Sequence, residues 1–156
     1  MLTQRRVKVI EYNARLGDPE AMNVLCLMKT DFLKVCDQII GGSLSKNSVE
    51  FEELSTVCKY AVPNGYPNKP AQGFVVDCKI EDLDVYLASV KSSGGQVVAC
   101  GSRTAAAIGK DKNVFVAEKF AERKISSVGG DLFHRKDIGT ESLISGRVNR
   151  MEKILK

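Results

Sequence analysis

The sequence VKVIEYNARLGDPEAMNVL, residues 7–25, decides how the chain is interpreted, because its chemistry changes from strand to loop to helix. Residues 7–13 are rich in β-branched side chains, which predicts a strand that ends at Asn13. Gly17 permits a loop conformation, and Asp18 before Pro19 is typical of a helix cap with proline at the first helical position. Apolar residues at a spacing of three, from Met22, then predict a helix.

A second helix is expected to follow directly. Thr30-Asp31 has the chemistry of an N-cap, the apolar residues of 32–40 recur at helical spacing, and Gly41-Gly42 ends the pattern. The stretch SLSKNSVE, residues 43–50, is polar and low in apolar side chains. We therefore expect a domain boundary there, with one unit over residues 1–48 and another over 49–156.

The second unit is expected to consist mostly of short strands, at 55–62, 74–80, 85–90 and 96–100, with residues 102–108 extending the last of them. Gly94-Gly95 predicts a hairpin turn. Residues 63–70 contain three of the four prolines and predict a non-regular loop.

One long amphipathic helix is predicted at 114–128, where the apolar residues fall on a single stripe and Gly129-Gly130 follows. Residues 131–139 form a polar, charged segment, and residues 142–156 predict a terminal helix. The expected fold class is α+β: a strand-loop-helix unit followed by a small, mainly antiparallel β domain with one long helix.

Composition narrows the classes of function. The 156 residues carry 23 Lys+Arg and 19 Asp+Glu, so the net charge of +4 is too small and dispersed to indicate nucleic-acid binding. No apolar stretch approaches the roughly 18 residues of a membrane span, and no signal sequence is evident. The five cysteines are scattered without metal-binding spacing, which is typical of reduced thiols. We expect a cytoplasmic protein without membrane or nucleic-acid partners.

The motif around Glu11, Asn13 and Arg15 has the chemistry of a metal site. Alternation along a strand would place Glu11 and Asn13 on the same face. A carboxylate and an amide oxygen are hard ligands that suit Mg²⁺, which also takes phosphate oxygens and water. Arg15 would bind an anion with its planar guanidinium. The alternative is a strand end with solvated polar side chains.

A second group of charged residues, His134-Arg135-Lys136-Asp137, lies beyond a Gly-Gly turn. Arg135 and Lys136 are candidates to hold a phosphate monoester. The alternative is a solvated basic loop in which Asp137 serves as an ion-pair partner. His134 has no second histidine or cysteine nearby in the sequence, so we expect it to be non-catalytic.

Three segments together resemble one family. Residues 7–25 are similar to the signature near the end of the ATP-grasp domain of the phosphoribosylamine–glycine ligase family, in its archaeal branch. Gly65-Tyr66-Pro67 resembles a turn of that family, and the segment FHRKDIG, residues 133–139, is similar to its closing motif. The three motifs occur in the family's order and cover nearly the whole chain.

The resemblance implies an ATP-dependent ligase that activates glycine as an acyl phosphate and joins it to 5-phosphoribosylamine, giving glycinamide ribonucleotide, ADP and phosphate. Glu11 and Asn13 match the family's metal ligands, for Mg²⁺ or Mn²⁺, and ATP is the co-substrate. Arg15 would lie near the activated carboxylate or the transferred phosphate. The ribose phosphate is a candidate ligand of Arg135 and Lys136.

The same resemblance implies that part of the ligase is missing. The substrate domain, the lid over ATP and a further glutamine ligand precede the family's matching segment. We therefore expect the chain to be the C-terminal portion of a ligase, inactive alone and dependent on its N-terminal portion. The alternative is a stand-alone, non-catalytic module derived from the ligase.

Overall fold

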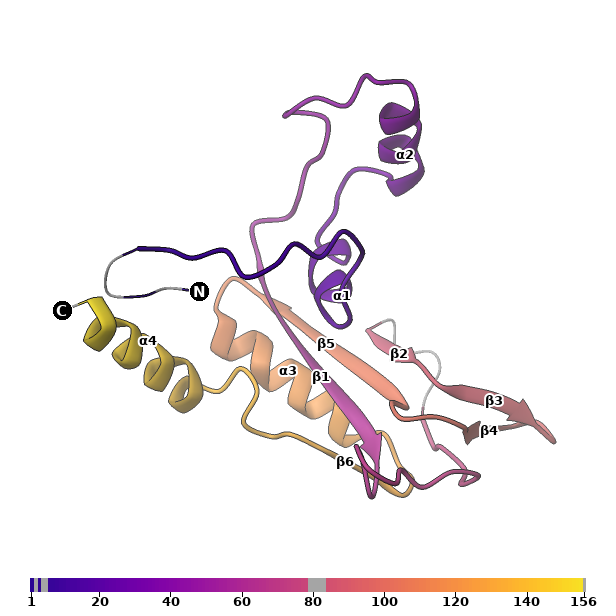
Figure 1. Cartoon of the computed structure of the whole chain (residues 1–156). Coiled ribbons are helices and arrows are strands. Elements are labelled where there is room, and N and C mark those ends of the chain that lie inside the picture. The colour runs from indigo at the N-terminus through magenta and orange to yellow at the C-terminus, as the bar shows by residue number, and fades with distance from the viewer. Residues whose placement is uncertain (2, 4–5, 79–83, 156) are drawn as a thin grey trace.

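The computed structural model describes residues 1, 3, 6–78 and 84–155 (Figure 1). It is an α+β fold, as expected from the sequence. The elements in chain order are α1 (Glu20–Leu25), α2 (Phe32–Ile40), β1 (Ser55–Pro63), β2 (Val85–Leu87), β3 (Val90–Ser93), β4 (Gln96–Ala99), β5 (Ala105–Asp111), α3 (Val114–Ser126), β6 (Leu132–His134) and α4 (Glu141–Leu155).

A four-stranded antiparallel sheet in the order β2-β5-β1-β6 forms the centre of the molecule. β5 pairs with β1 over its whole length, from Asp111 opposite Ser55 to Ala105 opposite Ala61. α3 lies along one face of these two strands (Figure 1). β3 and β4 form a separate hairpin, whose turn at Gly94-Gly95 has the positive φ angles (57° and 78°) that glycine adopts without strain.

The two faces of β1 have different partners because successive side chains point to opposite sides. Val57 packs against Ala117 and Ala121 of α3. α3 approaches the sheet closely at Gly109 of β5, where a Cβ atom would lie only 1.8 Å from the carbonyl oxygen of Ala117. The small residues at these positions therefore set the helix–sheet distance.

α1 covers part of the opposite face. Met22 and Cys26 pack against Cys58, Ala106 and Ile108, and the Thr56 hydroxyl donates a hydrogen bond to the Asn23 carbonyl (3.2 Å). This core joins residues from both expected domains, and the boundary between residues 48 and 49 stays a prediction.

The helices predicted at residues 32–40 and 114–128 form as α2 and α3. The Asp31 carboxylate accepts hydrogen bonds from the amides of Leu33 and Lys34, which caps α2 at its N-terminus. α3 spans most of the predicted 114–128 helix, and Asn113 caps it. The stripe is buried at Ala117, Ala121 and Ile125.

The strand predicted at residues 7–13 was wrong. Within the described residues, this stretch contributes only one isolated bridge, at Val7, and the following residues have no regular structure. Val9, Ile10 and Tyr12 are 66%, 74% and 87% exposed. Strand-forming side chains make a strand only where another strand supplies hydrogen-bond partners, and among the described residues no strand pairs with residues 9–13.

Several strand boundaries also differ from prediction. The 74–80 stretch forms isolated bridges at Val75 and Asp77 instead of a strand, and residues 79 and 80 lie outside the described residues. The 85–90 strand divides into β2 and β3, which belong to different sheets. Residues 102–108 do not extend β4, because β5 is a separate strand that pairs with β1. The polar 131–139 segment contains β6, which pairs with the end of β1.

Apolar side chains remain exposed on residues 7–16 and on α2. Leu33, Ile39 and Ile40 of α2 are 72%, 59% and 85% exposed, and α2 lies apart from the sheet in Figure 1. Among the described helices, none is both long and apolar enough to cross a bilayer. Exposed apolar area of this kind is typical of a surface that another protein segment covers.

Candidate functional site

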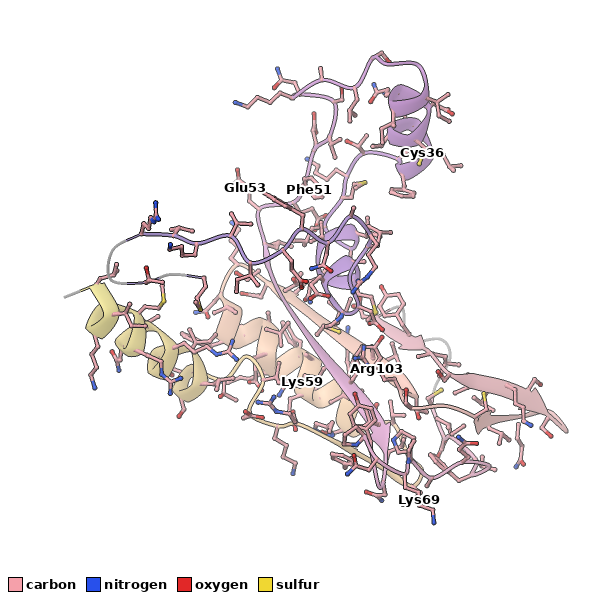
Figure 2. All side chains as sticks on the ribbon, in the orientation of Figure 1. Cys36, Phe51, Glu53, Lys59, Lys69 and Arg103 are labelled. Atoms are coloured by element: carbon pink, nitrogen blue, oxygen red, sulfur yellow. The ribbon has the colours of Figure 1, made fainter. Side chains whose placement is uncertain are left out.

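Asp18 holds the loop before α1 against the face of the sheet opposite α3. The Tyr60 hydroxyl donates a hydrogen bond to Asp18 Oδ1 (2.7 Å), and Arg103 Nη1 lies 2.9 Å from Asp18 Oδ2. The same Nη1 also donates to the Asp18 carbonyl (3.3 Å), and the Arg103 guanidinium lies 5.2 Å from the centre of the Tyr60 ring. Figure 2 shows Arg103 between α1 and the sheet.

The prediction that Asp18 caps α1 was therefore wrong. Pro19 occupies the N-cap position, and no side chain makes a capping hydrogen bond. The Asp18 carboxylate is instead shared between a tyrosine and an arginine that are distant in sequence. Burial and the hydrogen bond to Asp18 raise the pKa of Tyr60, so its hydroxyl keeps the proton that it donates. A hydrogen bond to Tyr66 raises the pKa of Arg103, which keeps that group charged.

Glu11 and Asn13 lie together, as the sequence motif predicted, although not on a strand. Asn13 Nδ2 donates to Glu11 Oε1 across 3.3 Å, and both residues are exposed. Since an amide oxygen and nitrogen exchange places on a flip of the side chain, the pair can present two oxygen ligands to one cation. The described part of the chain contains no cluster of three or more His, Cys, Asp or Glu side chains fit for a metal. These two residues thus supply an incomplete ligand set.

Arg15 is exposed and extends from the same loop. Its Nη1 donates to the Leu16 carbonyl (3.1 Å), which is the one side-chain hydrogen bond that it makes with described residues. Most of its guanidinium donors are therefore available to a ligand.

Arg135 forms an ion pair with Asp137, as one of the two sequence interpretations predicted. Nε and Nη2 of Arg135 lie 3.0 and 2.5 Å from the two carboxylate oxygens of Asp137. The hydrogen bond from Arg135 lowers the pKa of Asp137. The exposed pair uses only part of the guanidinium, so it does not test the phosphate-binding interpretation.

A buried lysine that sequence analysis did not single out fixes the position of this segment. Lys59 Nζ donates to Glu118 Oε1 (2.6 Å), Glu122 Oε2 (2.6 Å) and the Lys136 carbonyl (2.9 Å), and its side chain is 0% exposed. His134 Nε2 lies 3.0 Å from Glu122 Oε1. Burial acts to raise the pKa of Glu122, but hydrogen bonds from Lys59 and His134 lower it to about 2.

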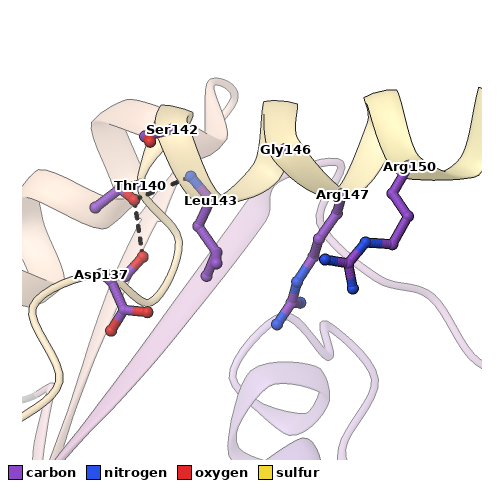
Figure 3. Close-up of a pocket in the computed structure, with 7 residues that line it drawn as sticks. All are labelled: Asp137, Thr140, Ser142, Leu143, Gly146, Arg147 and Arg150. Atoms are coloured by element: carbon purple, nitrogen blue, oxygen red, sulfur yellow. Dashed lines mark hydrogen bonds between the residues drawn. The ribbon is translucent and has the colours of Figure 1, made fainter.

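A cavity of about 300 Å³ lies where the loop before α1, β1 and the 133–138 segment meet. Its lining includes Pro19, Tyr60, Tyr66, Arg103, Arg135 and Ile138. A neighbouring cavity of about 490 Å³ shares Pro19, Arg135 and Ile138 and adds Arg147 of α4. Arg147 and Arg150 also line a third cavity, where both extend from α4 (Figure 3).

The structure separates the two residues proposed to hold phosphate. Arg135 lines the first two cavities, whereas Lys136 lines a different one with Ala61, Ile125 and His134. Arg135 directly follows β6, whereas Lys136 begins the turn formed by residues 136–139.

Comparison with known proteins identifies the family. The family model described as phosphoribosylglycinamide synthetase, C domain, matches residues 56–141. The chain is 49% identical to a phosphoribosylamine–glycine ligase of Methanococcus maripaludis, over 100% of this chain and 36% of that protein. The identity with the Methanocaldococcus jannaschii ligase is 42%, over 99% of this chain and again 36% of that protein.

A solved structure gives the same result. The crystal structure of phosphoribosylamine–glycine ligase from Thermotoga maritima superposes with a TM-score of 0.71 and 26% identity, covering 83% of this chain and 33% of that one. The chain thus spans little more than a third of the length of the curated relatives that it matches. It belongs to the phosphoribosylglycinamide synthetase C-domain family.

Proposed function

We propose that this chain is the C-terminal portion of an ATP-dependent ligase of cytoplasmic purine biosynthesis. In the proposed reaction, a carboxylate oxygen of glycine attacks the γ-phosphoryl group of ATP, releasing ADP and forming glycyl phosphate. The amine of 5-phosphoribosylamine then attacks the acyl carbon, loses a proton and expels phosphate, which gives glycinamide ribonucleotide. The names of the relatives and the family match support this proposal.

One observation about this chain carries the proposal. The Asp18 contacts to Tyr60 and Arg103 hold the loop that bears Glu11, Asn13 and Arg15 against the same face of the sheet that Arg135 borders. Pro19, which directly follows this loop, and Arg135, near the other end of the chain, line the same cavity.

Glu11 and Asn13 would hold Mg²⁺ or Mn²⁺. Their side chains are in contact, exposed and oxygen-bearing, which fits a cation that takes few protein ligands and completes its shell with phosphate oxygens and water. When bound, such an ion neutralises charge on the phosphates of ATP. Further ligands would come from ATP and from the N-terminal portion of the ligase.

The arginines would manage the anionic groups of the reaction. Arg15, in the same loop as the metal ligands, would stabilise negative charge on the activated carboxylate or the transferred phosphoryl group. Of the two residues that the sequence offered for the phosphate of 5-phosphoribosylamine, Arg135 is our candidate, because Lys136 lines a different cavity. These residues would position the substrates and neutralise their negative charge. The proton released from the attacking amine passes to solvent.

We expect the chain alone to be inactive. The exposed apolar residues of 7–16 and α2 fit a surface covered by the N-terminal portion.

The test is complementation. The chain is purified and mixed with the N-terminal portion of the Methanococcus maripaludis ligase, ending where the match to this chain begins. ADP release is then measured with glycine or phosphoribosylamine omitted in turn. We expect ADP formation that needs both substrates and both protein portions, and a loss of at least tenfold for Glu11→Gln.

Glu53→Gln is the matched control, because this exposed carboxylate lies outside the motif and should leave the rate unchanged. ADP formation by the chain alone would contradict the requirement for a partner. A mixture that binds but forms no ADP would favour the stand-alone, non-catalytic module.

A further inference from the structure

We propose that the cavity between Arg103 and Arg135 binds the phosphate group of a sugar phosphate. In this proposal, Arg103 is the residue that determines specificity for the phosphate group. The identity of the sugar, the ribose of the amine substrate, rests on the proposed function. The phosphate site itself rests on the side chains that line the cavity.

Two guanidinium groups from distant parts of the chain border the same cavity of about 300 Å³. Arg103 lies just before β5, and Arg135 follows β6. Two cations at one small cavity match a phosphate monoester, which carries nearly two negative charges and accepts several hydrogen bonds. Lys136 lines another cavity, so Arg103 replaces it as the second cation in this proposal.

Both guanidiniums keep donors for a ligand although each already has a carboxylate partner. Arg103 bonds to Asp18 through Nη1 and also meets Tyr66, and Arg135 bonds to Asp137 through Nε and Nη2. A guanidinium has five N–H donors, so neither set of contacts exhausts it. Within the described chain, neither aspartate belongs to the cavity lining.

The remaining walls strengthen an interaction with an anion. Tyr60, Val62, Phe133 and Ile138 present mostly apolar surface to the cavity. An apolar wall lowers the local dielectric, which makes a charge-assisted hydrogen bond stronger than it is in water.

The site is also preorganised. Arg103 is held by Asp18 and by the Tyr60 ring, which its guanidinium faces at 5.2 Å. The segment that carries Arg135 is anchored next to it by the hydrogen bond from buried Lys59 to the Lys136 carbonyl (2.9 Å). Donors fixed before binding reduce the entropy that the ligand contact must offset.

The location agrees with a substrate that reacts nearby. Pro19 is part of the cavity wall and belongs to the same loop as Arg15 and the proposed metal ligands. A phosphate held here would direct the other end of a small sugar phosphate along the face of the sheet that this loop covers.

The experiment titrates the isotope-labelled chain with ribose 5-phosphate, ribose or inorganic phosphate while amide shifts are followed by NMR. We expect ribose 5-phosphate to move the amides around Tyr66, Arg103 and Arg135 in a saturable way. Inorganic phosphate should move the same amides with weaker affinity, and ribose should not move them. Arg103→Gln and Arg135→Gln should each weaken ribose 5-phosphate binding at least tenfold.

Arg123→Gln is the matched control, because this exposed arginine of α3 stacks on Phe120 away from the cavity. It should bind as the parent does. Arg135→Gln removes only an exposed ion pair, so it keeps the test valid if Arg103→Gln unfolds the chain. Equal binding by both variants and the parent, or equal binding of ribose and ribose 5-phosphate, would overturn the inference.

The outcomes separate this inference from the proposed function. If the complemented ligase is active and neither variant raises its KM for phosphoribosylamine, the phosphate site is wrong and the ligase assignment stands. If ribose 5-phosphate binds through both arginines but the complemented protein forms no glycinamide ribonucleotide, the site stands and the ligase assignment fails.

Discussion

Asp18 Oδ2 lies 2.9 Å from Arg103 Nη1, which ties the loop before α1 to the residue that leads into β5. The Tyr60 hydroxyl completes the arrangement at 2.7 Å from Asp18 Oδ1. One carboxylate thereby connects the loop of the proposed metal ligands with the central sheet.

Asp18→Ala should loosen the loop more than it destabilises the protein. The Asp18 and Arg103 side chains are 57% and 37% exposed, so their ion pair is worth about 1 kcal/mol or less in unfolding free energy. We expect faster hydrogen exchange at the amides of residues 14–20, with a small change in global stability. Asp37→Ala, in exposed α2, is the control and should leave that exchange unchanged. Unaltered exchange in Asp18→Ala would show that other contacts hold the loop.

Lys59→Met should be strongly destabilising. The substitution keeps the volume of the side chain but leaves Glu118 and Glu122 without the cation that both contact at 2.6 Å. Breaking a buried ion pair by removing one partner costs about 3–5 kcal/mol, measurable by urea unfolding. Lys119→Met, an exposed lysine of the same helix as the two glutamates, should change stability by less than about 0.5 kcal/mol. A similar stability for both variants would contradict the structural role of Lys59.

The stability of the fold should fall in acid through Glu122. Its pKa is lowered from 4.5 to about 2 in the folded chain, so its contribution is present above pH 4.5 and disappears as the pH falls towards 2. The contribution amounts to about 3 kcal/mol as an order of magnitude. Urea midpoints measured from pH 6 to pH 2 should decline less steeply in Glu122→Gln than in the parent. Parallel curves would show that Glu122 titrates normally in the folded chain. Asp137 likewise has a lowered pKa, because Arg135 donates a hydrogen bond to it. It is present in both proteins, so it does not affect the difference between their two curves.

Gly109→Ala and Gly146→Ala should have opposite effects on the melting temperature. A Cβ at Gly109 would meet the Ala117 carbonyl oxygen at 1.8 Å, so α3 must move off the sheet, at a cost of about 1–3 kcal/mol or more. A Cβ at Gly146, within α4, meets no atom of the described chain within 4 Å. Alanine there should stabilise the helix by up to about 1 kcal/mol. An unchanged melting temperature for Gly109→Ala would mean that α3 packs more loosely than described.

Local signals explain which elements were predicted correctly. The Asp31 cap and the apolar spacing of α2 and α3 act within a few residues, so the sequence suffices to locate these helices. The prediction of a strand at residues 7–13 was wrong because a strand depends on a partner strand from another part of the sequence.

The site shows the same division between local and distant effects. The proximity of Glu11 and Asn13 follows from their spacing of two, whereas the contacts of Asp18 depend on Tyr60 and Arg103, which are 42 and 85 residues away. The burial of Lys59 could have been predicted from the sequence, because strand alternation places it on the same face as the apolar residues Val57 and Ala61, which are buried. A lysine in that row needs acidic partners, but only the fold identifies Glu118 and Glu122.

The most direct measurement of the central claim follows isotope-labelled glycine into product. The chain, the complementary N-terminal portion, ATP, Mg²⁺ and phosphoribosylamine are combined, and glycinamide ribonucleotide is quantified by mass spectrometry. We predict labelled product only when both protein portions are present, and at least tenfold less with Glu11→Gln. Labelled product from the chain alone, or none from a mixture shown to form a complex, would contradict the account.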